Sequence, residues 1–142
     1  MWCEVDIKKL IPQRDPIMMV DQLMDRNGDK AETSLVVTSD NYFMEANGML
    51  AEVGLIEHIA QSASAFAGYK ALLDGATEPP LGYIGEVKNF HCHRRPLAGE
   101  TLRTTITMGA EVAGITILTG ETRVNDELIA DTSMKIFIKN EA

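Results

Sequence analysis

The sequence predicts an α+β fold in which an antiparallel sheet wraps around one long central helix. Two observations support this prediction. Residues 51–73 form one long segment of mostly small and apolar residues with helical spacing, and the chain after Pro80 is rich in Thr, Ile, Val and Phe, interrupted by turn signals. A helix so rich in Ala, Ser and Gly offers little surface of its own, so we expect other elements to pack closely around it.

The first third of the chain contains few regular elements. Residues 7–24 are amphipathic, and Pro12 and Pro16 restrict any helix there to short pieces. An Asn-Gly-Asp turn at 27–29 precedes a strand that is predicted at 31–38 from its run of Leu and Val. The pattern therefore predicts a single strand before the central helix.

The central helix has recognisable ends. Residues 42–50 lack clear periodicity, whereas 51–73 keep a helical pattern over roughly 35 Å at 1.5 Å per residue. Asp74 and Gly75 end the helix, and the two prolines at 79–80 prevent it from continuing.

Four strands are predicted after the helix, because β-branched residues are frequent there and turn signals separate the runs. Leu102 and Ile106 alternate with Arg103 and Thr105, as in a sheet with one face in water. One long helix and about five antiparallel strands make a single hot-dog domain over residues 1–142. The four strands are predicted at 82–93, 101–108, 114–124 and 128–138.

The composition limits the kinds of partner. The chain has 142 residues, 45% of them hydrophobic, which is enough for one domain with a core. A net charge of −8 argues against nucleic acid or an anionic membrane as the main partner. No run has membrane-spanning length and the N-terminus lacks a signal-peptide pattern, so we expect a cytoplasmic protein. Cys3 and Cys92 are widely separated, which predicts reduced thiols, and we expect neither a metal nor another cofactor.

A polar stripe runs along the predicted central helix. At 100° per residue, Glu57 and Gln61 lie on one side, and Leu55, Ile59 and Phe66 lie on the other. A carboxylate among small residues on an apolar helix is costly unless it has a function or a partner, so the pattern favours a narrow, partly buried cleft. The alternative is that the stripe is the solvated face of the helix. The stripe consists of Gly54, Glu57, Gln61, Ser64 and Gly68.

Three motifs occur in an order typical of one enzyme family. Residues 11–21 contain Pro, Arg, Pro and Val-Asp, residues 57–61 read Glu-His-Ile-Ala-Gln, and residues 93–102 contain Arg-Arg-Pro-Leu-Ala-Gly-Glu. Together they resemble the motifs of the hot-dog (3R)-hydroxyacyl-[acyl-carrier-protein] dehydratases, although the third is one residue shorter and has Ala98 in place of the second proline. The resemblance implies a substrate held as a thioester on acyl carrier protein.

The resemblance has one important gap. Those dehydratases carry Gly-His-Phe-Pro ahead of the helix, and that histidine lies across the cleft from a Glu of the other subunit. Residues 42–50 of this chain contain no histidine. The chain more closely resembles a divergent branch of dehydratase-like proteins associated with aryl polyene pigment synthesis, which it matches over 51–61.

The chemistry of dehydration assigns roles to the helix residues. Removing water from a 3-hydroxyacyl thioester needs a base for the α-proton, an acid for the leaving hydroxide and donors for the thioester oxygen. Glu57 can serve only one of the first two steps, and Gln61 is placed to orient Glu57 or a water. Backbone N–H groups at the helix start are candidate donors to the thioester oxygen. The substrate-binding residues that we expect are Val53, Gly54, Ser64 and Phe90.

Three histidines and a basic cluster remain. His58 lies about 100° round the helix from Glu57, so the two side chains cannot face one point. His91 and His93 share one face of a predicted strand, and each of the three histidines either replaces the missing base or has a structural or surface role. The basic cluster either receives the acidic carrier protein or is a solvated strand end. The carrier-binding residues that we expect are Lys88, Arg94 and Arg95.

The leading hypothesis is a dehydratase-like protein of fatty acid or polyene biosynthesis that acts on 3-hydroxyacyl chains on acyl carrier protein. Hot-dog proteins dimerise by joining their sheets, so we expect a homodimer, or a heterodimer with a histidine-bearing hot-dog subunit. Two alternatives remain. One is an acyl thioesterase that uses Glu57 on water or on the carbonyl, and the other is a non-catalytic partner subunit of an active dehydratase.

Overall fold

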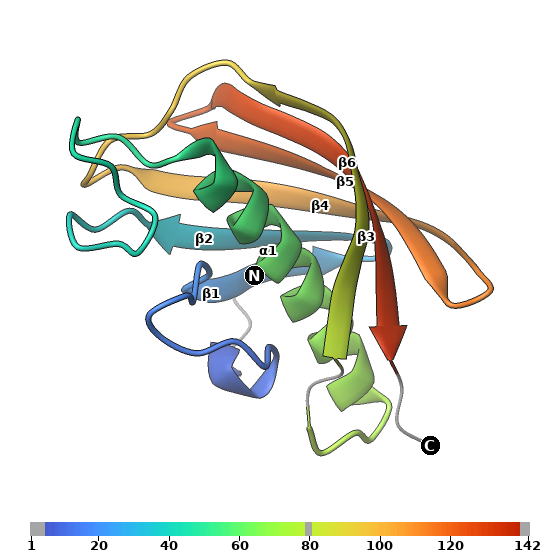
Figure 1. The fold of residues 1–142 in the computed structure, drawn as a ribbon. Coiled ribbons are helices and arrows are strands. Elements are labelled where there is room, and N and C mark those ends of the chain that lie inside the picture. Colours follow the sequence, from blue (N-terminus) through green and yellow to red (C-terminus); the bar gives the residue numbers. More distant parts are fainter. Residues whose placement is uncertain (1–4, 79–80, 140–142) are drawn as a thin grey trace.

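One sheet curls around one helix in the computed structural model, which describes residues 5–78 and 81–139. Helix α1 (Glu52–Leu73) lies along the concave face of the sheet (Figure 1), as the sequence predicts. Ala51 is its N-cap and Asp74 its C-cap, within one residue of the predicted ends. Cys3, a predicted free thiol, lies outside the described residues. None of the described helices has the length and hydropathy needed to cross a membrane.

The sheet has six strands, all antiparallel to their neighbours, in the order β1-β2-β4-β5-β6-β3. β1 and β3 therefore form its two edges, far apart in the curled sheet (Figure 1). A short 3-10 helix, Ile7–Lys9, precedes the sheet. The strands are β1 (Gln22–Asn27), β2 (Lys30–Val36), β3 (Leu81–Cys92), β4 (Thr101–Val112), β5 (Ile115–Val124) and β6 (Glu127–Lys139).

The sequence prediction missed one strand. β1 was expected to be part of an irregular opening, so the expectation of a single strand before the helix was wrong. Its register against β2 shifts between Leu23 and Asp25, which breaks the two-residue alternation that identifies a strand. The strands predicted after the helix are confirmed as β3 to β6, with β4 extending four residues further, to Val112.

Alternation along the central strands directs one row of side chains toward α1. In β4, Leu102, Thr104 and Ile106 are fully buried, while Thr101 and Arg103 are exposed on the other face. This confirms the predicted sheet with one face in water. The buried row packs against the side of α1 that was predicted to be apolar, which comprises Leu55, Ile59 and Phe66.

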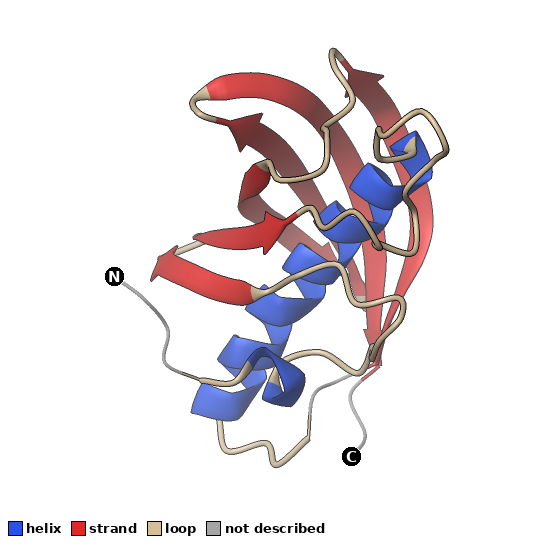
Figure 2. Cartoon of the chain, turned by 90° about the vertical axis from the view of Figure 1, so that its left-hand side faces the viewer, coloured by secondary structure: helices blue, strands red, loops and turns tan. Residues whose placement is uncertain are grey.

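The N-terminal segment covers a second side of α1. The 3-10 helix lies against the C-terminal half of α1 (Figure 2). A Cβ placed on Gly68 would collide with the carbonyl oxygen of Leu10, and one on Gly54 would lie 2.7 Å from the Cβ of Phe43. Two glycines of the predicted polar stripe therefore let other parts of the chain approach the helix closely. The prediction that other elements wrap tightly around this helix is confirmed.

Gly68→Ala should destabilise the fold. In an open helix this change would stabilise by up to about 1 kcal/mol, but here the added methyl group meets a backbone carbonyl, which cannot rotate away. We expect urea denaturation followed by circular dichroism to show a loss of about 1–3 kcal/mol in the free energy of unfolding. Ser64→Ala, one turn earlier on a half-exposed face, is the control and should stay within about 0.5 kcal/mol of wild type. Equal stability of the two variants would contradict the close packing at Gly68.

Candidate active site on helix α1

Glu57 lies at the boundary between a covered side and an open side of α1, and its side chain is half-buried. Gln61, one turn further along the helix, donates a hydrogen bond from Nε2 to Oε1 of Glu57 at 2.9 Å. Within the described part of the chain, Oε2 of Glu57 has no hydrogen-bond partner. One oxygen of this carboxylate is therefore held in place, and the other remains available to a substrate or water.

The open side of α1 is small and apolar apart from Glu57. Val53 is 57% exposed, and Ile56, Ser64 and Ala67 are partly exposed on the same side of the helix. Val53 and Ser64 were predicted to bind substrate, and both lie on this surface beside Glu57. That they bind an acyl chain, and that Glu57 faces a tunnel between two subunits, remain predictions.

Gln61 is fully buried and every polar atom of its amide is occupied. Its Oε1 accepts the backbone N–H of Met19 at 2.6 Å, and its Nε2 donates to the carbonyl of Ile17 at 2.7 Å as well as to Glu57. Because the Gln61 side chain is fully buried, its amide oxygen is not accessible to a substrate or to bulk water. Of the two predicted roles, the geometry supports the orientation of Glu57. No signal in the sequence pointed to Met19 as the group that holds Gln61.

His58 is a buried structural residue in this geometry. It is 0% exposed, with Nδ1 2.6 Å from the carbonyl oxygen of Met19 and Nε2 2.7 Å from Oγ1 of Thr104 on β4. A carbonyl can only accept, so Nδ1 carries the proton and Nε2 accepts from the threonine hydroxyl. Burial lowers the pKa of His58 to about 4, and the bond to Met19 opposes this only in part. His58 is thus neutral at pH 7 and points away from the open side of α1.

The other two histidines bind a carboxylate at the end of β3. Nδ1 of His91 and Nε2 of His93 each lie 3.0 Å from a different oxygen of Asp131, and both rings are exposed. Hydrogen bonds from the two imidazoles hold the pKa of Asp131 below its usual value. In the strand register Asp131 of β6 lies opposite His91 of β3 on one side and opposite Glu121 of β5 on the other. This row of side chains is on the face of the sheet away from α1. Neither His91 nor His93 therefore lies on the side of the sheet where α1 and Glu57 are.

The predicted basic cluster is largely neutralised by neighbouring acids. Arg94 makes a two-point ion pair with Glu100, at 2.8 and 3.1 Å, and also contacts Glu127. Hydrogen bonds to Glu100 and Glu127 raise the pKa of Arg94, and the Arg94 guanidinium holds the pKa of Glu100 below its usual value. Arg95 and Lys88 likewise have acidic partners, Glu45 for the first and Glu86 for the second. The carrier-binding role of Lys88, Arg94 and Arg95 stays a prediction. The two arginines also stabilise loops, since Arg94 binds Glu100 and Arg95 donates to the carbonyl of Leu50.

The start of α1 differs from its predicted form. The N–H of Gly54 donates to the carbonyl of Ala51 at 2.9 Å, so it is not a free donor for a thioester oxygen, as was expected. Phe43, which the sequence analysis did not single out, packs over Gly54 in the loop where related dehydratases carry their histidine. The Asn41 side chain fixes this loop by accepting the N–H of Phe43 at 2.8 Å. Phe90, a predicted substrate contact, is half-buried against a group of buried hydrophobic residues that includes Leu55 and Leu102.

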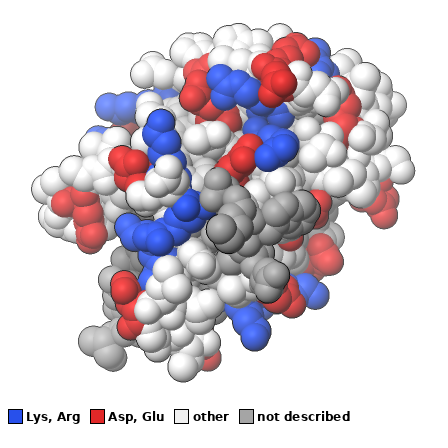
Figure 3. All heavy atoms as spheres, turned by 180° about the vertical axis from the view of Figure 1, so that it is seen from behind, with Lys and Arg blue, Asp and Glu red and all other residues white. Residues whose placement is uncertain are grey.

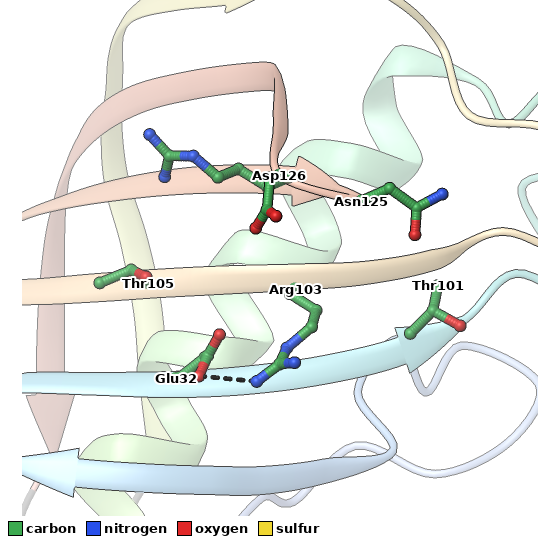
Figure 4. A pocket seen from close by; sticks show the side chains of 7 residues that line it. Glu32, Thr101, Arg103, Thr105, Asn125 and Asp126 are labelled. Atoms are coloured by element: carbon green, nitrogen blue, oxygen red, sulfur yellow. Dashed lines mark hydrogen bonds and ion pairs between the residues drawn. The ribbon is translucent and has the colours of Figure 1, made fainter.

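A polar pocket of about 430 Å³ lies on the opposite face of the sheet (Figure 4). Arg103 and Arg123 are direct cross-strand neighbours there, and Arg103 pairs with Glu32 at 3.0 Å. Seen from this side, charges of both signs are interspersed over the molecule (Figure 3). The described residues contain no group of three or more His, Cys, Asp or Glu side chains suited to a metal ion. The pocket contains none of the predicted site residues, so α1 remains the candidate site.

The buried His58 should make stability depend on pH. The pKa of His58 falls from 6.5 in an exposed imidazole to about 4 in the fold, so between these pH values the unfolded chain binds a proton that the folded chain does not. We therefore expect the free energy of unfolding to fall by about 3 kcal/mol as the pH drops from 6.5 to 4, measured by urea denaturation. His58→Gln should flatten this slope. Ser62→Ala, which alters a buried but non-titrating neighbour, should keep it, and a slope shared by all three chains would contradict the assignment.

Comparison with known proteins identifies the family of this chain. The chain matches the model of the family described as ApeP-like, ApeP dehydratase, over residues 5–142. It is 26% identical to the 3-hydroxyacyl-[acyl-carrier-protein] dehydratase FabZ of Shewanella loihica, over 91% of this chain and 87% of that one, and 25% identical to FabZ of Allorhizobium ampelinum, over 96% and 89%. A chain of the dehydratase heterocomplex ApeI:P from Xenorhabdus doucetiae has the same fold, with a TM-score of 0.87, 15% identity and coverage of 98% and 94%. Because the family model covers nearly all of the sequence, this chain belongs to the ApeP-like family of hot-dog dehydratases.

Proposed function

We propose that this protein takes part in the dehydration of 3-hydroxyacyl thioesters on acyl carrier protein, and that it supplies Glu57 to a site completed by a second hot-dog subunit. The observation that carries the proposal is the hydrogen bonding of Glu57 and of the three histidines. Glu57 has one oxygen held by Gln61 and one available, whereas His58, His91 and His93 are all hydrogen-bonded elsewhere. These are the only three histidines in the sequence.

The reaction needs two proton transfers at opposite ends of one bond change. A base removes the proton from the α-carbon, and the electron pair forms the new double bond as the C–O bond to the 3-hydroxyl group breaks. An acid protonates the leaving hydroxide, and the products are an enoyl thioester and water. Glu57 performs one of these transfers, and a histidine on the second subunit performs the other.

The sheet offers a way to join a second subunit. Among the described residues β3 pairs only with β6, which leaves its other edge unpaired there. Ile84 and Val87 on this strand are 41% and 36% exposed. Exposed strand edges readily pair with another chain. The Xenorhabdus doucetiae structure is a heterocomplex, which supports a partner of a different sequence. We propose such a heterodimer in the cytoplasm, with aryl polyene synthesis as its setting.

Docking of the carrier protein is best tested at Lys88. Its ion pair with Glu86 is long, at 3.6 Å, and its side chain is 52% exposed, whereas Arg94 and Arg95 are more buried and more tightly paired. An acidic carrier protein requires such available cations on an acidic enzyme. Lys88 is therefore the carrier contact that we propose first, and the two arginines are second.

Glu57→Gln should abolish dehydration without unfolding the protein. The amide keeps an oxygen that can accept the hydrogen bond from Gln61 but cannot transfer a proton at neutral pH. With the histidine-bearing partner subunit present in every assay, we expect kcat to fall by about 10²–10⁴-fold, with the thermal midpoint of the variant unchanged or raised. Glu52→Gln, at an exposed position in the first turn of α1, is the matched control and should keep its activity. Wild-type turnover by Glu57→Gln would refute the assignment.

The isolated chain should dehydrate its substrate slowly or not at all. No histidine of this chain lies free beside Glu57, and a general base must come within about 2.6–3.2 Å of the proton that it takes, directly or through one water. Addition of a hot-dog subunit that carries a histidine ahead of its helix should restore turnover, as followed by formation of the enoyl thioester. Full activity of the pure homodimer would overturn the two-subunit site. Release of a free acid would identify a thioesterase instead, and no product with any partner would identify a non-catalytic subunit.

A further inference from the structure

A line of buried hydrogen bonds joins the sheet to Glu57. Thr122 on β5 and Thr104 on β4 have their hydroxyls 2.7 Å apart, and Thr104 contacts Nε2 of His58 at 2.7 Å. The line continues from Nδ1 of His58 to the carbonyl of Met19, from the N–H of Met19 to Gln61, and from Gln61 to Glu57. All the residues between the sheet and Glu57 in this line are fully buried, so water does not compete for their hydrogen bonds. They are Thr122, Thr104, His58, Met19 and Gln61.

In every hydrogen bond of this line the donor lies on the Thr122 side and the acceptor lies on the Glu57 side. His58 must donate from Nδ1 to the Met19 carbonyl, so its Nε2 accepts from Thr104, whose hydroxyl oxygen then accepts from Thr122. The N–H of Met19 donates to Gln61, and Gln61 donates to Glu57. The line therefore ends with an N–H donor of Gln61 that faces the carboxylate of Glu57.

Two side chains of α1 hold the backbone of Met19 from both sides. His58 binds its carbonyl and Gln61 binds its N–H, both at 2.6 Å. The positions of Met19 and of Ile17 decide which way the Gln61 amide faces, because the N–H of Met19 requires an oxygen and the carbonyl of Ile17 requires an N–H. With this orientation, an N–H and not an oxygen of Gln61 faces Glu57.

We propose that His58 is a positioning residue for Glu57, which it serves by fixing the Met19 backbone that orients Gln61. This inference rests on the proposed function, since it assumes that Glu57 transfers a proton. Loss of the His58 donor leaves the Met19 carbonyl buried without a partner, which favours movement of the segment 17–19. The Gln61 amide then loses its fixed orientation, and a displacement of about 1 Å at a reacting group can cost 10²-fold in rate.

Ser62 provides a matched control. Like His58, it is 0% exposed, lies on α1 and bonds to the sheet, through Oγ1 of Thr33 at 2.7 Å. Its own hydroxyl donates to the carbonyl of His58 within the helix, also at 2.7 Å. These bonds do not lead to Gln61 or Glu57. Loss of the Ser62 hydroxyl thus affects packing between helix and sheet and leaves the orientation of the carboxylate alone.

The test compares His58→Leu, His58→Asn and Ser62→Ala in the protein combined with its histidine-bearing partner, using a 3-hydroxyacyl chain on acyl carrier protein. His58→Leu should lower kcat by about 10–100-fold and leave KM within about twofold, since the substrate surface is unchanged. His58→Asn, whose amide N–H can replace the Nδ1 donor, should recover most of the loss in kcat. Ser62→Ala should lower the thermal midpoint and leave kcat within about twofold.

Three outcomes would overturn the positioning role. They are wild-type kcat in His58→Leu, failure of His58→Asn to recover kcat although it is folded, and a loss of kcat in Ser62→Ala as large as that in His58→Leu. If His58→Leu does not fold, His58→Ala, which also removes the Nδ1 donor to Met19, replaces it in the comparison with His58→Asn. His58→Ala should lower kcat and His58→Asn should keep it, and equal kcat in the two variants would overturn the positioning role. Activity in Glu57→Gln would refute the proposed function itself, and this result is separate from any result at His58.

Discussion

The packing of one helix with almost no side-chain bulk determines most of this structure. Helix α1 has Gly, Ala or Ser on much of its surface, so both the sheet and the N-terminal segment lie close to its backbone. Gly68 admits the carbonyl of Leu10, and Gly54 admits Phe43. Such close contacts with the helix backbone exclude water over a wide arc of the helix. Every polar side chain within that arc therefore needs a partner from the protein.

The buried polar residues of α1 meet this requirement without a charged group. His58, Gln61 and Ser62 all point into covered regions, and each is bonded to backbone or to a threonine of the sheet. A protonated imidazole at His58 would lack a counter-charge in this setting, so burial keeps it neutral. Only Glu57, at the boundary of the covered arc, combines a fixed position with access to the open side. The same packing thus satisfies the buried polar groups and exposes one carboxylate.

The proposed reaction site needs more than this one chain. The side of α1 that carries Glu57 is open, and β3 is one of the two edge strands of the sheet. The loop that carries a histidine in related dehydratases is occupied here by Phe43, which is used in packing against Gly54. The Xenorhabdus doucetiae structure that contains a chain of the same fold is a heterocomplex. A second subunit that supplies a base is consistent with each of these features.

The sequence alone determined the elements whose pattern is local: the long helix, the four later strands, the turns between them and the stripe that contains Glu57. These follow from spacing and turn chemistry within a few residues. The sequence did not reveal β1, because its register shift disrupts alternation, nor did it show that Arg94 and Arg95 are paired with acids distant along the chain. Only the tertiary structure decided which polar residues are bonded to each other. The hydrogen bonds of His58 and Gln61 with the Met19 backbone join residues about forty positions apart in the sequence, and no local pattern encodes a contact of that separation.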